Sequence, residues 1–289
     1  MIPPSFDYVA PKTLSEAVAA LGGNENAKIL AGGQSLIPLM RFRLASPALL
    51  VDLNRVEGLS HIEEKEGWLK IGAMTREADV ERSSLIHNKY PLLADTVKVI
   101  SDPIVRNLGT VGGNLANADP GNDHPATMLA YGAEVVAVGP KGERVIPITS
   151  FFLGLYESAL SRDEILTEVR IPVPRPRSGG AYLKVERKVG DFATAAVAVQ
   201  VELDDQGNFA SVGIGLTNVG LTAIKATTAE DFLKGKPPSE ENFREAAKLA
   251  ADAAQPVADV RGSEEYKRSL VRTLTVRALR RAVQRAKGG

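Results

Sequence analysis

Two pairs of adjacent glycines are the residues with the clearest chemical use. The first pair lies in residues 31–36 (AGGQSL), after a predicted strand and before a predicted helix. Adjacent glycines let backbone amides turn toward one point without a Cβ in the way, and a helix start adds unpaired N–H groups. Such a turn suits an anionic phosphate, although a tight turn with an N-capping serine has the same sequence.

The second pair lies in residues 110–114 (TVGGN), with Asp123 nine residues further on. The surrounding stretch 101–125 is rich in Gly, Asn, Asp and Pro, and we expect a long ordered loop there. Long ordered loops in compact domains are usually functional, but a hairpin turn is the simpler alternative. Two such loops in neighbouring units could hold the two ends of one pyrophosphate.

Three other patterns have plainer explanations. Residues 213–218 (GIGLTN) approach the G-x-G-x-x-G pattern, but Asn218 replaces the third glycine, so we expect a strand end. His124 follows Asp123 and could act as a general base, although such a pair more often caps a loop. The basic residues within 272–287 are expected on a solvated or subunit-facing surface of the last helix.

The composition excludes several classes of protein. The 289 residues contain no Cys, which excludes disulfides, a catalytic thiol and Cys-held zinc or iron–sulfur sites on this chain. With three His as well, we expect no metal site. Thirty-five Lys and Arg balance 35 Asp and Glu, which argues against a nucleic-acid partner. No apolar run reaches the ~18 residues of a transmembrane segment, and no signal-peptide pattern is present, so we expect a cytoplasmic protein.

The elements that must position the glycine pairs form two small α/β units. In the first, about 1–57, a capping box of Thr13 and Glu16 predicts a helix start. Strands are expected at 6–9, 28–30 and 48–53, and a helix at 36–44. In the second, about 58–176, we expect strands at 68–72, 134–138, 144–148 and 165–171, and helices at 75–83, 92–100 and 126–131.

The pattern changes after a Pro- and Gly-rich linker at 172–180. Alternating apolar residues predict antiparallel strands at 181–188, 194–203 and 209–216, and two helices follow at 240–253 and 264–287. The sequence thus predicts an α+β chain with one domain at 1–176, made of the two α/β subdomains, and a second at 177–289.

Taken together, the two glycine segments resemble those of the FAD-binding medium subunit of the molybdenum hydroxylase family, which includes carbon monoxide, xanthine and aldehyde dehydrogenases. The resemblance covers essentially the whole chain, including residues 4–8 (PSFDY), 102–114, 188–193 (KVGDFA) and 266–268. It implies two α/β subdomains of the vanillyl-alcohol-oxidase-like (PCMH-type) FAD-binding fold, followed by a C-terminal domain of antiparallel strands and helices.

The resemblance also implies which residues contact FAD. Residues 29–36 and 110–114 would wrap the phosphates and the ribityl chain, and Asp123 would help hold the adenosine end. Lys184 would lie near the isoalloxazine, Asp191 near its reactive edge, and Ile100 where the xanthine dehydrogenase branch has an aromatic residue. The implied FAD contacts are Ile29, Leu30, Ala31, Gly32, Gly33, Gln34, Ser35, Leu36, Ile100, Thr110, Val111, Gly112, Gly113, Asn114, Asp123, Leu166, Lys184 and Asp191.

In this family, electrons reach the flavin from molybdenum through [2Fe–2S] clusters. Because this chain has no Cys, those clusters must lie on a small partner subunit and the molybdenum cofactor on a large one, typically in a dimer of heterotrimers. The chain would then pass electrons to an external acceptor without a catalytic side chain of its own. Two alternatives stay open: a free-standing FAD-dependent oxidoreductase of the same fold, and a non-catalytic binding or assembly module.

Overall fold

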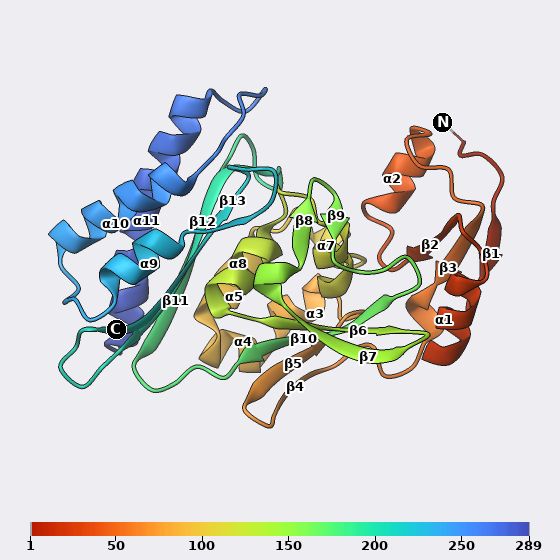
Figure 1. The fold of residues 1–289 in the computed structure, drawn as a ribbon, viewed down its shortest axis with the longest axis horizontal. Helices are drawn as coiled ribbons and strands as arrows, with labels where there is room; N and C mark the ends of the chain where they lie inside the picture. Colours follow the sequence, from red (N-terminus) through yellow and green to blue (C-terminus); the bar gives the residue numbers. More distant parts are fainter. Residues whose placement is uncertain (1, 289) are drawn as a thin grey trace.

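Three main sheets, each with its own helices, follow one another along the long axis of the computed structural model (Figure 1), which describes residues 2–288. Each sheet contributes to a separate cluster of buried apolar side chains. The mixed α+β fold predicted from the sequence is therefore confirmed.

The first sheet is parallel, in the order β1-β3-β2. The helix that crosses it begins at the predicted capping box, in which the amide of Glu16 donates to Thr13 Oγ1 at 3.2 Å and the Glu16 carboxylate accepts from the Thr13 amide. Its apolar side is buried on the sheet, as the helical spacing predicted. The elements are β1 (Asp7–Val9), α1 (Leu14–Gly22), β2 (Ala27–Leu30), α2 (Leu36–Arg41), β3 (Leu49–Asp52) and the 3-10 turn η1 (Leu53–Arg55).

The second sheet is antiparallel, in the order β4-β5-β10-β6-β7, and its helices pack on one another and on the C-terminal sheet. Its strands are β4 (Ile62–Lys65), β5 (Trp68–Gly72), β6 (Glu134–Gly139), β7 (Gly142–Pro147) and β10 (Ile165–Pro172). The helices are α3 (Glu77–Arg82), α4 (Ser84–Lys89), α5 (Pro91–Lys98), α6 (Pro103–Arg106), α7 (Val111–Asn117), α8 (Asp123–Tyr131) and the 3-10 turn η2 (Ile148–Ser150), and a small hairpin adds β8 (Phe152–Gly154) and β9 (Glu157–Ser158).

The prediction of one long loop over residues 101–125 was wrong. This stretch contains α6 and α7, and α8 begins at Asp123 instead of 126. Asp102 and Thr110 cap the two short helices, accepting the amides of Val105 at 2.9 Å and Gly113 at 3.1 Å. Burial of apolar residues of α7 in the core then outweighs the poor helix propensity of its glycines.

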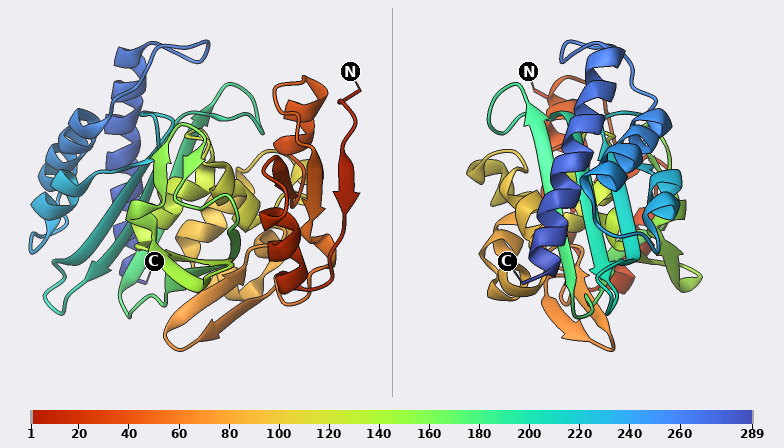
Figure 2. Two further views of the ribbon diagram at one scale, coloured as in Figure 1. Left: turned by 45° about the vertical axis from the view of Figure 1, so that its right-hand side comes forward. Right: turned by 90° about the vertical axis from the view of Figure 1, so that its left-hand side faces the viewer.

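The third sheet is antiparallel, in the order β11-β12-β13-β14, and has helices on both faces (Figure 2). Alternate residues of the central strand face opposite ways: Val197 and Val199 join the cluster of the C-terminal helices, whereas Ala196 and Ala198 join that of α5 and α8. The elements are β11 (Ser178–Glu186), β12 (Ala193–Leu203), β13 (Phe209–Thr217), β14 (Ile224–Lys225), α9 (Thr227–Leu233), α10 (Glu240–Ala253) and α11 (Glu264–Ala286).

The pattern at residues 213–218 belongs mostly to β13, so it forms no nucleotide-binding turn. A Cβ at Gly213 or Gly215 would overlap the backbone of α8, which crosses the strand there. These glycines therefore let a helix approach a sheet closely.

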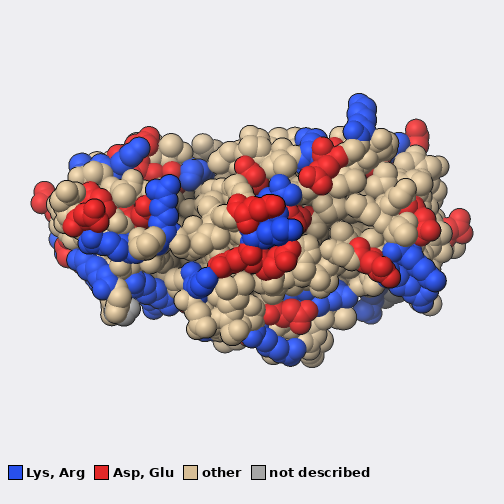
Figure 3. Space-filling model, turned by 90° about the horizontal axis from the view of Figure 1, so that it is seen from below, with Lys and Arg blue, Asp and Glu red and all other residues tan. Residues whose placement is uncertain are grey.

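Charged side chains of both signs are interspersed on the face shown in Figure 3, in keeping with the zero net charge of the sequence. Within residues 2–288, no helix combines the length and apolar character that crossing a membrane requires. The basic residue Arg280 of α11 pairs with Glu240 of α10 at 2.8 Å, so part of the basic stretch in the last helix ties two helices together.

Candidate cofactor site

A cavity of about 1000 Å³ lies where the first sheet, the helices α7 and α8, and the strand β11 meet. This volume is at the upper end of the range for small-molecule sites. Sixteen of the eighteen residues predicted from the resemblance line it. Leu30 and Val111 do not: Leu30 is half-buried at the end of β2, and Val111, the first residue of α7, is fully buried in the core.

The first glycine segment, residues 31–36, presents unused backbone donors on the cavity wall. Gly33 has a φ of +73°, a left-handed conformation that turns the chain back on itself. Within the described chain, no hydrogen bond uses the amides of residues 32–36 as donors. Ser35 stands at the N-cap of α2 without making a side-chain cap bond. The segment therefore offers a set of free N–H groups of the kind that binds phosphate oxygens.

In the second glycine segment, residues 110–114, most backbone amides donate hydrogen bonds within the protein. Gly112 donates to Ala73 O at 2.9 Å, Gly113 to Thr110 Oγ1, and Asn114 to Thr110 O at 2.9 Å. The amide of Val111 donates to Thr75 O at 3.1 Å. This segment is the first turn of α7, not the open loop expected from the sequence, and it lacks the free amides of the first segment.

One glycine of each pair serves packing. A Cβ on Gly32 would overlap the carbonyl of Leu108, and a Cβ on Gly112 would lie 2.5 Å from Ala73 Cβ. At the other glycine of each pair, an added Cβ would meet a side chain and not the backbone of another element. A Cβ on Gly33 would lie 2.7 Å from Ile37 Cδ1, and a Cβ on Gly113 would lie 2.7 Å from Thr110 Oγ1. Gly32 and Gly112 thus let backbone segments from different elements touch beside the cavity.

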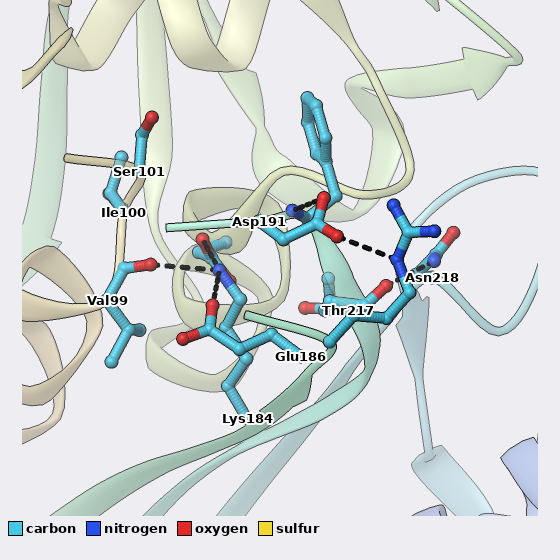
Figure 4. A network of polar contacts seen from close by, with 12 residues as sticks. Val99, Ile100, Ser101, Lys184, Glu186, Asp191, Thr217 and Asn218 are labelled. Atoms are coloured by element: carbon cyan, nitrogen blue, oxygen red, sulfur yellow. Dashed lines mark hydrogen bonds and ion pairs between the residues drawn. The ribbon is translucent and has the colours of Figure 1, made fainter. Parts of the chain in front are cut away.

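A buried polar cluster forms the wall contributed by the C-terminal sheet (Figure 4). Lys184 Nζ donates to Asp123 Oδ2 at 3.0 Å and to the carbonyl oxygen of Val99 at 2.9 Å, and lies 3.4 Å from Glu186 Oε2. Tyr182 donates its hydroxyl to Asp123 Oδ1 at 2.6 Å. The side chains of Lys184 and Asp123 are 2% and 6% exposed, so their charges are paired away from bulk water.

Burial raises the pKa of Asp123, while the Lys184 ammonium and the Tyr182 hydroxyl act in the opposite direction. Burial beside that carboxylate also raises the pKa of Tyr182 well above its usual value, which keeps the phenol protonated as a donor. Asp123 contacts Lys184 directly, so the two side chains lie at one place on the cavity wall, whereas the resemblance assigned them to opposite ends of FAD.

Asp191 lies on the neighbouring turn between β11 and β12 (Figure 4). Its carboxylate accepts from Arg261 at 3.0 Å and from Arg187 at 2.9 Å, and hydrogen bonding to Arg261 is the main reason why its pKa falls to about 2. It also accepts the amide of Phe192 at 2.8 Å. Asp191 is thus a fixed negative charge on the cavity wall.

Comparison with known proteins identifies this architecture. A family profile described as the FAD binding domain in molybdopterin dehydrogenase matches residues 4–174, and one for the CO dehydrogenase flavoprotein C-terminal domain matches residues 180–282. The chain belongs to this family of flavoproteins.

Relatives match this chain over nearly its full length. It is 44% identical to the carbon monoxide dehydrogenase medium chain of Hydrogenophaga pseudoflava, over 98% of both chains. It is 38% identical to the 6-hydroxypseudooxynicotine dehydrogenase complex subunit alpha of Paenarthrobacter nicotinovorans, over 99% of this chain and 97% of that one. A solved structure of the H. pseudoflava carbon monoxide dehydrogenase lacking the Mo-pyranopterin moiety superposes with a TM-score of 0.96 at 44% identity, covering 99% of each chain.

Membership of this flavoprotein family makes FAD the cofactor and the chain an oxidoreductase subunit. The cavity fits an FAD pyrophosphate, because residues 32–36 line it, their amides donate to no other group of the described chain, and Gly33 makes a turn that only glycine adopts easily. His124, considered as a general base from the sequence, lies outside the cavity. Its ring is fully buried, Nε2 lies 2.7 Å from Glu77 Oε2, and it does not line the cavity, so it is not positioned as a general base on a ligand.

Sequence reasoning missed several residues of the flavoprotein cavity. One group lies at the start of β2 and after α2, a second lies in the segment before β10, a third flanks Asp191, and two further residues lie at the start of α3 and after α5. No motif marks these positions, since they reach the cavity only through the packing of separate elements. They include Asn26, Lys28, Leu44, Ala45, Ser46, Pro47, Glu77, Ser101, Tyr156, Leu160, Ser161, Arg162, Glu164, Gly190 and Phe192.

Proposed function

We propose that the chain holds FAD with its pyrophosphate on the free amides of residues 32–36. The five unused N–H groups around the left-handed Gly33 carry this assignment. The second segment forms the facing wall through its packed first turn, with Thr110, Gly113 and Asn114 on the cavity surface. Ile29 and Leu166 complete the wall as further FAD contacts.

We place the isoalloxazine beside Lys184, Asp191 and Ile100. The contact between Asp123 and Lys184 supports moving Asp123 to the same end. The adenosine then occupies the opposite stretch, lined by Asn26, Lys28 and Ser46. Lys184 holds the wall at Val99 in place, while Asp123 and Asp191 supply fixed acceptors there.

FAD, when bound, accepts and releases electrons, and we propose that this chain passes them from a small [2Fe–2S] subunit to an external acceptor. Relatives named as medium chains or subunits of complexes support such partners. The absence of Cys supports placing the iron–sulfur clusters on another chain, with molybdenum on a large subunit. A dimer of heterotrimers in the cytoplasm, and a domain boundary between residues 176 and 177, complete the proposal.

The substrate is chosen on another subunit in this proposal. Relatives similar over their whole length are named for carbon monoxide and for 6-hydroxypseudooxynicotine, which are chemically unlike substrates. One medium-chain architecture thus accompanies different substrates, which supports a role in electron transfer over a role in substrate recognition.

An FAD titration of the purified chain, followed by quenching of flavin fluorescence, tests the proposal. We expect saturable one-to-one binding, and its loss in the double variant Gly33→Val, Gly113→Val, because Cβ atoms there would lie 2.7 Å from Ile37 Cδ1 and from Thr110 Oγ1 and would displace both segments. Full FAD affinity in a folded double variant would contradict the site. Substrate turnover by the isolated chain would instead favour a free-standing oxidoreductase, and stoichiometric partner binding without flavin would favour an assembly module.

A further inference from the structure

The two glycine segments belong to different subdomains, yet they touch. A Cβ on Gly32 would overlap the carbonyl oxygen of Leu108 and would lie 2.9 Å from Gly109 Cα. No β-sheet ladder joins the two subdomains at this point, because β2 and β3 pair within the first sheet only. Something other than sheet pairing must therefore hold the two segments at a fixed separation.

Arg76 lies directly behind this contact. Its backbone forms an antiparallel bridge to Thr110, with the amide of Glu77 donating to Gly109 O at 3.0 Å. Its guanidinium donates from one nitrogen to the carbonyl oxygen of Leu108 and from another to Asn54 Oδ1 at 2.5 Å. One side chain thus contacts the stretch leading into the second glycine segment and also reaches the first subdomain.

Asn54 completes the connection to the first glycine segment. Its Nδ2 donates to the carbonyl oxygen of Ala31 at 3.0 Å. Asp52 fixes the Asn54 side chain by accepting from its Nδ2 at 2.5 Å, and Tyr8 in turn donates to Asp52 at 2.5 Å. A continuous series of hydrogen bonds therefore runs from the residue before Gly32 to the residue before Gly109.

We propose that Arg76 and Asn54 are positioning residues that set the separation of the two glycine segments to suit a dinucleotide pyrophosphate. Neither residue lines the cavity, so they act through Ala31 and Leu108 and not by touching the cofactor. The inference rests on the proposed binding of FAD at the first segment. An arginine suits the role because its planar guanidinium holds donors in two fixed directions, which the single ammonium of lysine cannot reproduce.

The test compares the variants Arg76→Met, Arg76→Lys, Asn54→Ala and the double variant Arg76→Met, Asn54→Ala. Each is titrated with FAD, which carries a pyrophosphate, and with FMN, which carries one phosphate. We expect each single variant to weaken FAD binding about ten- to a hundredfold, the effect of losing hydrogen bonds to a charged donor or their anchor. FMN affinity should change less than about threefold, because a single phosphate held by residues 32–36 does not depend on the position of the facing second segment. The double variant should lose little beyond the worse single variant, because both residues serve one connection.

Arg82→Met is the matched control, since Arg82 is exposed at the end of α3, the helix that follows Arg76. It should leave FAD binding unchanged. The melting temperature of each ligand-free variant reports whether it is folded.

Three results would overturn the inference. Normal FAD affinity in Asn54→Ala together with a loss in Arg76→Met would show that only the positive charge matters. Equal losses for FAD and FMN, or additive losses in the double variant, would show general weakening of the fold. Wild-type chain that binds neither FAD nor ADP would refute the proposed function itself, and the positioning role with it.

Discussion

The two glycine segments look alike in the sequence and do different work in the structure. In residues 31–36 the glycines open the backbone, and five amides are left without partners on a cavity wall. In residues 110–114 the amides are taken by Thr75, Ala73 and Thr110, and the glycines begin a helix. The same dipeptide thus supplies ligand donors at one site and close packing at the other. What distinguishes them is the state of their amides, which the side-chain pattern does not reveal.

The largest expected effect comes from Gly33→Val alone. A branched residue at a φ of +73° is strained, and its side chain would meet Ile37, so the five amides must move. We expect FAD affinity to fall on the order of a hundredfold, measured by fluorescence quenching. Gly113→Val should have a smaller effect, because the amides around it are not ligand donors. Equal losses of FAD affinity in both variants would contradict the different roles assigned to the two segments.

The next effect is on stability and comes from Gly112→Ala. The added Cβ would lie 2.5 Å from Ala73 Cβ and 2.8 Å from Ala73 Cα, so α7 must shift away from Ala73, which directly follows β5. We expect the free energy of unfolding to fall by about 1–3 kcal/mol, measured by urea denaturation of the ligand-free chain. Gly22→Ala is the control, since a Cβ there meets nothing within 4 Å. A stable Gly112→Ala variant with weakened FAD binding would assign this glycine to the ligand instead.

The smallest expected effect is on stability and concerns the part of the cavity wall around Asp191, on the turn between β11 and β12. Its pKa of about 2 lies below the ordinary 3.8, so its ion pairs stabilise the fold above about pH 4 and lose this contribution as the pH falls through 2. Arg261→Met removes the partner that lowers this pKa most. We expect the variant to be less stable than wild type at pH 6, with the difference shrinking toward pH 2, in urea midpoints measured across that range. A difference that does not vary with pH would assign Arg261 to packing alone.

Much of the fold was predictable where local signals and burial agree. The range 240–253 is a helix from its first residue to its last, because Ser239 caps it and its apolar residues keep a helical spacing. The hairpin of β6 and β7 followed from its Gly-Pro-Lys-Gly turn. Helices α4, α6, α7 and α9 and strands β4, β8, β9 and β14 were missed, because they are short and depend on tertiary packing for their stability.

The candidate site was likewise predicted in part: its positions were indicated, but the contacts between them were not. Family resemblance indicated positions that the structure brings together on one cavity, including Asp123 and Lys184, which are far apart in the chain. It did not indicate that these two residues form an ion pair, nor that Arg76 connects the glycine segments. Such contacts depend on which elements pack together, and a single sequence carries no local signal for them.

The position of Lys184 and Asp191 in the chain also fixes the order in which the cavity can be completed during synthesis. A ribosome releases both glycine segments and Asp123 before it releases β11. Until that strand emerges, Asp123 lacks its cation, and the apolar sides of α5 and α8 lack the sheet that buries them. The cavity therefore gains its last wall only when the C-terminal sheet folds.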